Sequence, residues 1–189
     1  LDEKERKKFI SEIEKLRTKE PEFSGWLLLL LFTGQRSNNV IRMKWSQLNM
    51  ENKTWSIPSE EMKSRRSFVC NLNDFAVDII KSFPRDREYV IHSNPDPKKQ
   101  LNNWQKTWMR RRIPMGFGAL EGNARNAVNP HDLRRTYGAI LAQNNYSLHA
   151  IAHALGQVSI AATSIYARIN EATLANASEF VEKELLGIS

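Results

Sequence analysis

Apolar residues recur along most of the chain at helical spacing. Residues 3–19 alternate charged and apolar positions with a helical period, and residues 22–33 form an almost continuous apolar segment typical of a buried helix. Gly34 follows where a helix commonly ends, and Ser37 begins a short amphipathic helix. Further helices are predicted after the capping residue Asn73 and over residues 100–113, 130–143, 147–155, 159–168 and 171–185.

The pattern changes between Trp45 and Asn71. Residues 54–57 and 68–70 predict two short strands, with residues 63–66 either in the polar turn between them or at the start of the second strand. Residues 89–91 predict a third strand. The sequence therefore predicts a mainly α fold (α+β), in which helices surround a small three-stranded antiparallel sheet.

Length and composition set limits on this picture. The 189 residues, of which 41% are hydrophobic and 26% charged, suit one compact soluble domain. The longest apolar run, Trp26–Phe32, is far shorter than the ~20 residues that span a bilayer, and the charged N-terminus does not resemble a signal peptide. The single cysteine, Cys70, excludes an internal disulfide and fits a reducing cytoplasm. Because Leu1 is not a methionine, we expect the chain to be cut from a longer protein.

The net charge of +7 and the pI of about 9.6 favour an acidic partner, either nucleic acid or a membrane surface. The tightest basic cluster is Arg110–Arg112, and other cations are spread along the chain. Charge alone does not decide between these partners.

The segment Asn129–Thr136 contains the first candidate site. Asn129 suits a helix N-cap and Pro130 the first helical position, so His131 and Arg134 share one helical face. A helix N-terminus that presents His and Arg together can bind phosphate. By itself the segment also fits an ordinary solvated helix start.

Three other positions stand out less. Arg36 follows the glycine that ends a helix, Lys63 lies at the predicted hairpin, and Tyr166 comes nine residues after Gln157 in a Leu-Gly-Gln segment. Taken singly, these residues fit a surface arginine, a solvated lysine and a packing tyrosine.

The order of the four motifs resembles the tyrosine recombinase (lambda-integrase, phage integrase) family over roughly residues 1–170. TGQRSNNVIRMKW resembles the first arginine motif of the family, MKSRRSFVCNL its lysine hairpin, and HDLRRT with LGQVSIAATSIY its second motif. The MKxRR pattern is most similar to prophage and genomic-island integrases.

The resemblance implies a helical catalytic domain and a set of catalytic residues. Arg36 and Arg134 would hold the scissile phosphate, a bidentate task for which lysine is a poor substitute. Tyr166 would attack to give a 3′-phosphotyrosyl link and a free 5′-hydroxyl. Lys63 would protonate the leaving oxygen, and His131 would carry a proton or donate a hydrogen bond. Neither a metal, ATP nor another cofactor would be required.

Two positions depart from the family pattern. Asn39 stands where the family usually has an acid, and Gln157 stands where it usually has His or Trp. Gln157 can still donate a hydrogen bond to a phosphate oxygen but cannot titrate, so the departure bears on the level of activity.

The resemblance also implies the partners and the domain plan. We expect residues 1–189 to be the catalytic domain of a longer integrase, without its N-terminal core-binding and arm-binding domains, and with residues 170–189 as a tail helix. The partners would be attachment sites in double-stranded DNA and further copies of the protein, assembled on DNA as a tetrameric synapse. A bacterial or phage protein of this kind would act in the cytoplasm, in association with the nucleoid.

Three alternatives remain at this stage. The chain could be a catalytically idle DNA-binding relative, a type IB topoisomerase with the same chemistry but without site preference, or a metal-dependent nuclease. The last lacks an evident cluster of acids, because HDLRR contains a single Asp.

Overall fold

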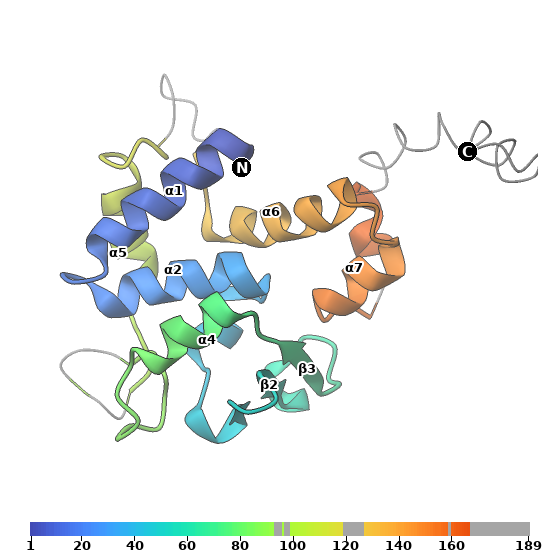
Figure 1. The fold of residues 1–189 in the computed structure, drawn as a ribbon, viewed down its shortest axis with the longest axis horizontal. Coiled ribbons are helices and arrows are strands. Elements are labelled where there is room, and N and C mark those ends of the chain that lie inside the picture. Colours follow the sequence, from blue (N-terminus) through green and yellow to red (C-terminus); the bar gives the residue numbers. More distant parts are fainter. Residues whose placement is uncertain (93–95, 97–98, 119–126, 159, 167–189) are drawn as a thin grey trace, which may run out of the picture. The chain divides into compact units, whose positions relative to one another are not determined.

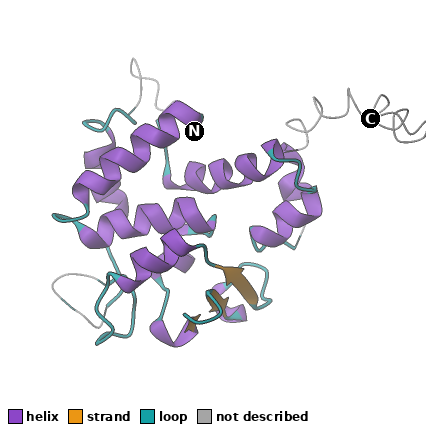
Figure 2. Ribbon diagram, viewed as in Figure 1, coloured by secondary structure: helices purple, strands orange, loops and turns teal. Residues whose placement is uncertain are grey.

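The computed structural model describes residues 1–92, 96, 99–118, 127–158 and 160–166. The chain divides into two compact units, Leu1–Tyr137 and Gly138–Ser189, and each is described by itself. Helices account for most of the described elements, and the strands lie in the first unit (Figure 2).

Helices form the frame of the first unit. The central helix α2 (Pro21–Thr33) packs against α1 (Glu3–Leu16), α3 (Ser37–Ile41) and α4 (Asp74–Lys81), and it lies between α1 and α4 in Figure 1. Almost every side chain of α2 is buried, as its continuous apolar sequence predicts. Helix α5 (Trp104–Arg112) and the first half of α6 (Pro130–Gln143) complete this frame.

Local sequence signals explain where these helices begin and end. Asp2 and Glu5 form a reciprocal capping box at the start of α1. Gly34 ends α2 in the left-handed conformation with φ of 65°, and the Asn73 side chain caps α4. One predicted boundary was wrong, because α1 ends at Leu16 rather than near residue 19. Pro21 begins α2, in keeping with the preference of proline for a first helical turn.

The sheet has three antiparallel strands in the order β1–β2–β3, which confirms the predicted fold class. Strand β2 (Thr54–Ile57) pairs with β3 (Phe68–Asn71), Trp55 opposite Cys70, and also with β1 (Leu48–Asn49). The prediction of a third strand at residues 89–91 was wrong, because Tyr89 makes only an isolated bridge with Lys44. Short 3₁₀ helices, η1 (Trp45–Gln47) and η2 (Ser59–Glu61), flank the sheet strands.

The described part of the second unit consists of the end of α6, helix α7 (Leu148–Ala154) and the 3₁₀ helix η5 (Ile160–Tyr166), which packs on α7. The Ser147 side chain caps α7. The helix predicted over residues 159–168 is thus a 3₁₀ helix where it is described. The tail helix predicted over residues 170–189 lies outside the described residues.

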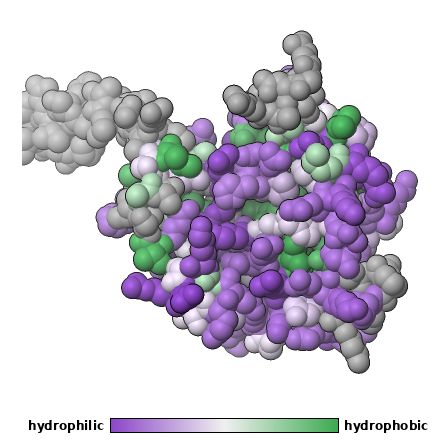
Figure 3. Space-filling model, turned by 180° about the vertical axis from the view of Figure 1, so that it is seen from behind, coloured by the Kyte–Doolittle hydropathy of each residue, from purple (hydrophilic) through white to green (hydrophobic). Residues whose placement is uncertain are grey.

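The core of the first unit is aromatic as well as aliphatic. Trp26 packs against Phe23 and Trp104, and Phe9 packs against Trp108 and Phe117. The visible surface of the described residues is mostly hydrophilic (Figure 3). Within the described residues, no helix is both long and apolar enough to cross a membrane.

The single thiol of the chain provides a first prediction. Burial raises the pKa of Cys70 to about 12, although the Gln35 side chain and the charge of Arg134 act in the opposite direction. Because the thiolate is the reactive form, native Cys70 is expected to react with a thiol reagent at pH 8 about 10³-fold more slowly than a free cysteine. Denaturation should restore full reactivity. Rapid stoichiometric labelling of the native protein would show that the Cys70 side chain is not buried as described.

Candidate active site

Helix α6 presents His131 and Arg134 from its first turns, as predicted. The N-terminus of α6 differs in one detail from the predicted cap at Asn129. Asp132 Oδ2 accepts a hydrogen bond from the backbone N–H of Asn129 at 2.9 Å, whereas Asn129 Oδ1 accepts a hydrogen bond from the Arg112 side chain. An acid at the third position supplies this cap because it can fold back onto the N-cap backbone.

Arg134 is held rigidly. Its side chain is only 3% exposed, and Nη1 donates to the carbonyl oxygen of Gly34 at 2.7 Å. The carbonyl belongs to the residue that ends α2, so the Gly34 turn connects the Thr33–Arg36 motif to α6. A guanidinium carries its N–H groups in a planar fork whose geometry matches a bound anion.

Arg36 and His131 belong to the same group of charges. Loss of hydration lowers the pKa of His131, Arg135, Arg134 and Arg36 lower it further, and Asp132 opposes them. Partial burial also lowers the pKa of Arg36. The first unit therefore brings Arg36, His131 and Arg134 close enough to affect one another.

Two polar atoms at this group are buried and have no hydrogen-bond partner among the described residues. They are Nη1 of Arg36 and Oγ of the next residue, Ser37. Buried donors are nearly always hydrogen-bonded in folded proteins. Both groups can donate a hydrogen bond to an anion bound beside these cationic side chains.

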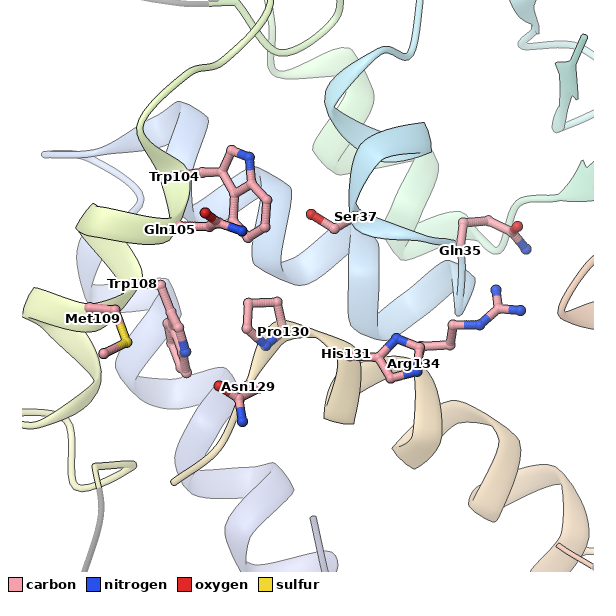
Figure 4. A pocket seen from close by; sticks show the side chains of 10 residues that line it. All are labelled: Gln35, Ser37, Trp104, Gln105, Trp108, Met109, Asn129, Pro130, His131 and Arg134. Carbon is pink, nitrogen blue, oxygen red and sulfur yellow. The ribbon is translucent and has the colours of Figure 1, made fainter. Parts of the chain in front are cut away.

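A cavity of about 430 Å³ opens beside these residues. Figure 4 shows its two ends: one is formed by side chains of α5 and by Pro130, and the other by Gln35, His131 and Arg134. The complete lining is Gln35, Ser37, Trp104, Gln105, Trp108, Met109, Asn129, Pro130, His131 and Arg134.

Lys63 lies elsewhere in the first unit. As predicted, it occupies the exposed turn between β2 and β3, and this turn lines a different cavity with Ser59, Glu60, Met62 and Arg65. The buried Asn39 amide contacts the sulfur of Met62 at 3.3 Å. Asn39 thus ties α3, which follows Arg36, to the residue preceding Lys63.

The second unit contains Gln157 and Tyr166. Gln157 follows the Gly156 turn at the end of α7, and its Oε1 accepts a hydrogen bond from the Thr163 hydroxyl at 2.9 Å. Tyr166, at the end of η5, is only 5% exposed. A Cβ at Gly138 would clash with Cζ and Oη of Tyr166, so the tyrosine ring occupies space that only a glycine leaves on α6.

Sequence reasoning missed Thr163 and Gly138. An interior glycine costs a helix about 1 kcal/mol relative to alanine, so Gly138 was a detectable signal of a close approach. Thr163 carried no comparable signal, because its partner is visible only once the chain has folded. Within the described residues, no group of three or more His, Cys, Asp or Glu side chains could hold a metal ion.

Comparison with known proteins agrees with this architecture. Residues 1–173 match the Phage integrase family. The integrase of Salmonella phage P22 is 24% identical over 173 residues, which cover 89% of this chain and 43% of the phage protein. The tyrosine recombinase XerD of Staphylococcus saprophyticus is 22% identical over 151 residues, covering 78% of this chain and 50% of XerD.

Solved structures show the same fold. The XerH site-specific recombinase in its pre-cleavage complex with difH substrate superimposes with a TM-score of 0.71 at 22% identity, covering 96% of this chain and 54% of XerH. The catalytic domain of bacteriophage HP1 integrase gives a TM-score of 0.68 at 18% identity, covering 95% of this chain and 93% of that domain.

The fold is therefore that of a tyrosine recombinase catalytic domain. The chain belongs to the phage integrase family. It spans about half the length of the curated relatives it matches.

Proposed function

We propose that this chain is the catalytic domain of a site-specific recombinase that cuts and rejoins double-stranded DNA through a covalent tyrosyl intermediate. The observation that carries the proposal is the group formed by Arg36, His131 and Arg134 beside the cavity, in a chain whose family match extends past Tyr166. We propose that this group holds the scissile phosphate.

The reaction needs no net input of energy. The Tyr166 oxygen forms a bond to phosphorus while the bond from phosphorus to the 5′-oxygen breaks, which leaves the DNA attached through a 3′-phosphotyrosyl link. The lowered pKa of His131 favours the neutral imidazole, which can accept the phenolic proton. Lys63 donates a proton to the departing 5′-oxygen. Attack by a 5′-hydroxyl of another strand reverses these steps and rejoins the DNA.

The positive side chains have the main catalytic role in this scheme. Negative charge grows on the non-bridging oxygens in the transition state, and Arg36 and Arg134 stabilise it together with hydrogen-bond donors, among them the Gln157 amide. Gln157 and Tyr166 belong to the second unit, and Arg36, His131 and Arg134 belong to the first.

The proposed partners follow from this function. They are attachment sites on duplex DNA and further copies of the protein, which would assemble as a tetrameric synapse in the full-length protein. XerH and the lambda integrase, two structural relatives, are described in complexes with their DNA sites. We further propose that the protein acts in the cytoplasm, in association with the nucleoid.

Cleavage should be independent of metal and nucleotide, because Arg36, Lys63 and Arg134 supply the positive charge. With a nicked suicide substrate and excess EDTA, the chain should accumulate a denaturant-resistant DNA adduct at the rate seen with Mg²⁺, within about twofold. The adduct is measured by denaturing electrophoresis. A strict requirement for a divalent metal would contradict the mechanism and favour a nuclease.

The close packing of the Tyr166 ring against Gly138 gives another prediction. Gly138→Ala should force the Tyr166 ring to move, because its new methyl group would overlap the phenol. A displacement of ~1 Å can slow a positioned reaction about 10²-fold, so cleavage should fall by this order while DNA affinity stays unchanged. Ala139→Gly makes the reverse exchange at the next position of α6 and is expected to leave cleavage nearly unaltered. Unchanged cleavage by Gly138→Ala would mean that the packing of Tyr166 against Gly138 is not needed for the reaction.

A further inference from the structure

The backbone of Gln157 is fixed by the way α7 ends. Gly156 is left-handed, with φ of 59°, and its N–H donates to the carbonyl of His153 at 2.8 Å. The Gln157 N–H donates to the carbonyl of Ala152, also at 2.8 Å. These two bonds define a Schellman motif, which sets the position from which the Gln157 side chain leaves the backbone.

The side chain of Gln157 is held at a second point. Thr163 is fully buried at 0% exposure, and its hydroxyl donates to Gln157 Oε1 at 2.9 Å. A threonine hydroxyl can donate or accept a hydrogen bond, and in this structure the Thr163 hydroxyl donates to the amide oxygen. In this arrangement the amide oxygen is the acceptor, and the N–H groups of Nε2 are the donors that the Gln157 side chain offers.

We propose that Thr163 is a positioning residue for catalysis, which fixes the Gln157 amide so that Nε2 donates to a non-bridging oxygen of the scissile phosphate. This inference rests on the proposed function. An amide whose oxygen accepts a hydrogen bond is also a more polarised donor. Without the Thr163 hydroxyl, the amide can rotate and turn its oxygen towards the phosphate, which repels it.

Three variants separate positioning from a general effect on η5. Thr163→Val keeps the shape of the side chain but removes the hydroxyl, and Thr163→Ser restores the hydroxyl. Ser164→Ala is the matched control, since the Ser164 hydroxyl lies on the same 3₁₀ helix but donates to the carbonyl of Ala161 instead, at 2.7 Å. Thermal melting of each variant shows whether it is folded.

The measurement is single-turnover cleavage of a suicide substrate at saturating DNA, with DNA affinity measured separately. Thr163→Val should slow cleavage about 10- to 100-fold with little change in affinity, whereas Thr163→Ser and Ser164→Ala should stay within about threefold of the parent. Gln157→Ala alone should slow cleavage about 10²- to 10³-fold. In the Gln157→Ala protein, adding Thr163→Val should hardly change the cleavage rate further, because the amide that the Thr163 hydroxyl positions is already absent.

Several outcomes would overturn the inference. The positioning role is contradicted if Thr163→Val cleaves at the parent rate while Gln157→Ala cleaves slowly. It is also contradicted if Thr163→Val slows cleavage as much in the Gln157→Ala protein as it does in the parent. If Gln157→Ala cleaves normally, both roles fail, but the proposed recombinase function stands as long as the parent forms its adduct. Absence of any adduct with the parent protein overturns the proposed function itself.

Discussion

Tyr166→Phe is expected to abolish the covalent DNA adduct completely while DNA affinity remains within about twofold of the parent. The change removes only the phenolic oxygen, which is the atom that forms the bond to phosphorus in the proposed reaction. The ring itself is buried against Gly138 and should stay there, since phenylalanine has the same shape. Gel-based detection of the adduct and a binding titration measure the two quantities on one substrate.

Tyr146→Phe is the matched control for this variant. Tyr146 is half exposed and precedes the Ser147 cap of α7, so it belongs to the same unit but has no place in the proposed chemistry. Its variant should form the adduct at the parent rate. An adduct that survives in Tyr166→Phe would assign the nucleophile to another residue.

Arg134→Lys is expected to slow cleavage about 10³- to 10⁵-fold, the range typical of an arginine that stabilises a phosphoryl transition state. Nη1 of Arg134 donates to the Gly34 carbonyl, and the guanidinium carries its N–H donors in a fixed planar fork. A lysine ammonium is a single point of charge and cannot reproduce this fork. The charge is kept, so weak DNA binding should change much less than cleavage.

Arg135→Lys tests whether position, rather than charge, is decisive. Arg135 is the next residue on α6, but its side chain is exposed and pairs with Asp132 at 3.0 Å. Cleavage by this variant should stay within a few-fold of the parent, since exposed ion pairs contribute little. Equal cleavage rates for the Arg134→Lys and parent proteins would contradict a catalytic role for Arg134.

The fold was largely predictable because its signals are local. The glycine at position 34, the cap at Asn73 and the apolar segment of α2 each act within a few residues, and the structure has them as predicted. The third strand was mispredicted because β1 has only two residues, Leu48 and Asn49, which are too few to produce an alternating pattern. Residues 89–91 have the composition of a strand, but Tyr89 makes only an isolated bridge.

The site was predictable in part. Order along the chain identified Arg36, His131 and Arg134, and the structure brings these three together. Their catalytic roles, like those of Lys63, Gln157 and Tyr166, stay predictions. The hydrogen bond from Thr163 to Gln157 could not be predicted, because it depends on how η5 folds back towards Gln157 and neither residue type is unusual at its position.

The central claim is that Tyr166 attacks DNA and retains its 3′ end. The most direct test traps the adduct on a suicide substrate, digests the protein and the DNA, and identifies the modified peptide by mass spectrometry. The account predicts a nucleotide linked through its 3′-phosphate to Tyr166. A nucleotide on another residue, a 5′-phosphate link, or cleaved DNA without any adduct would contradict it.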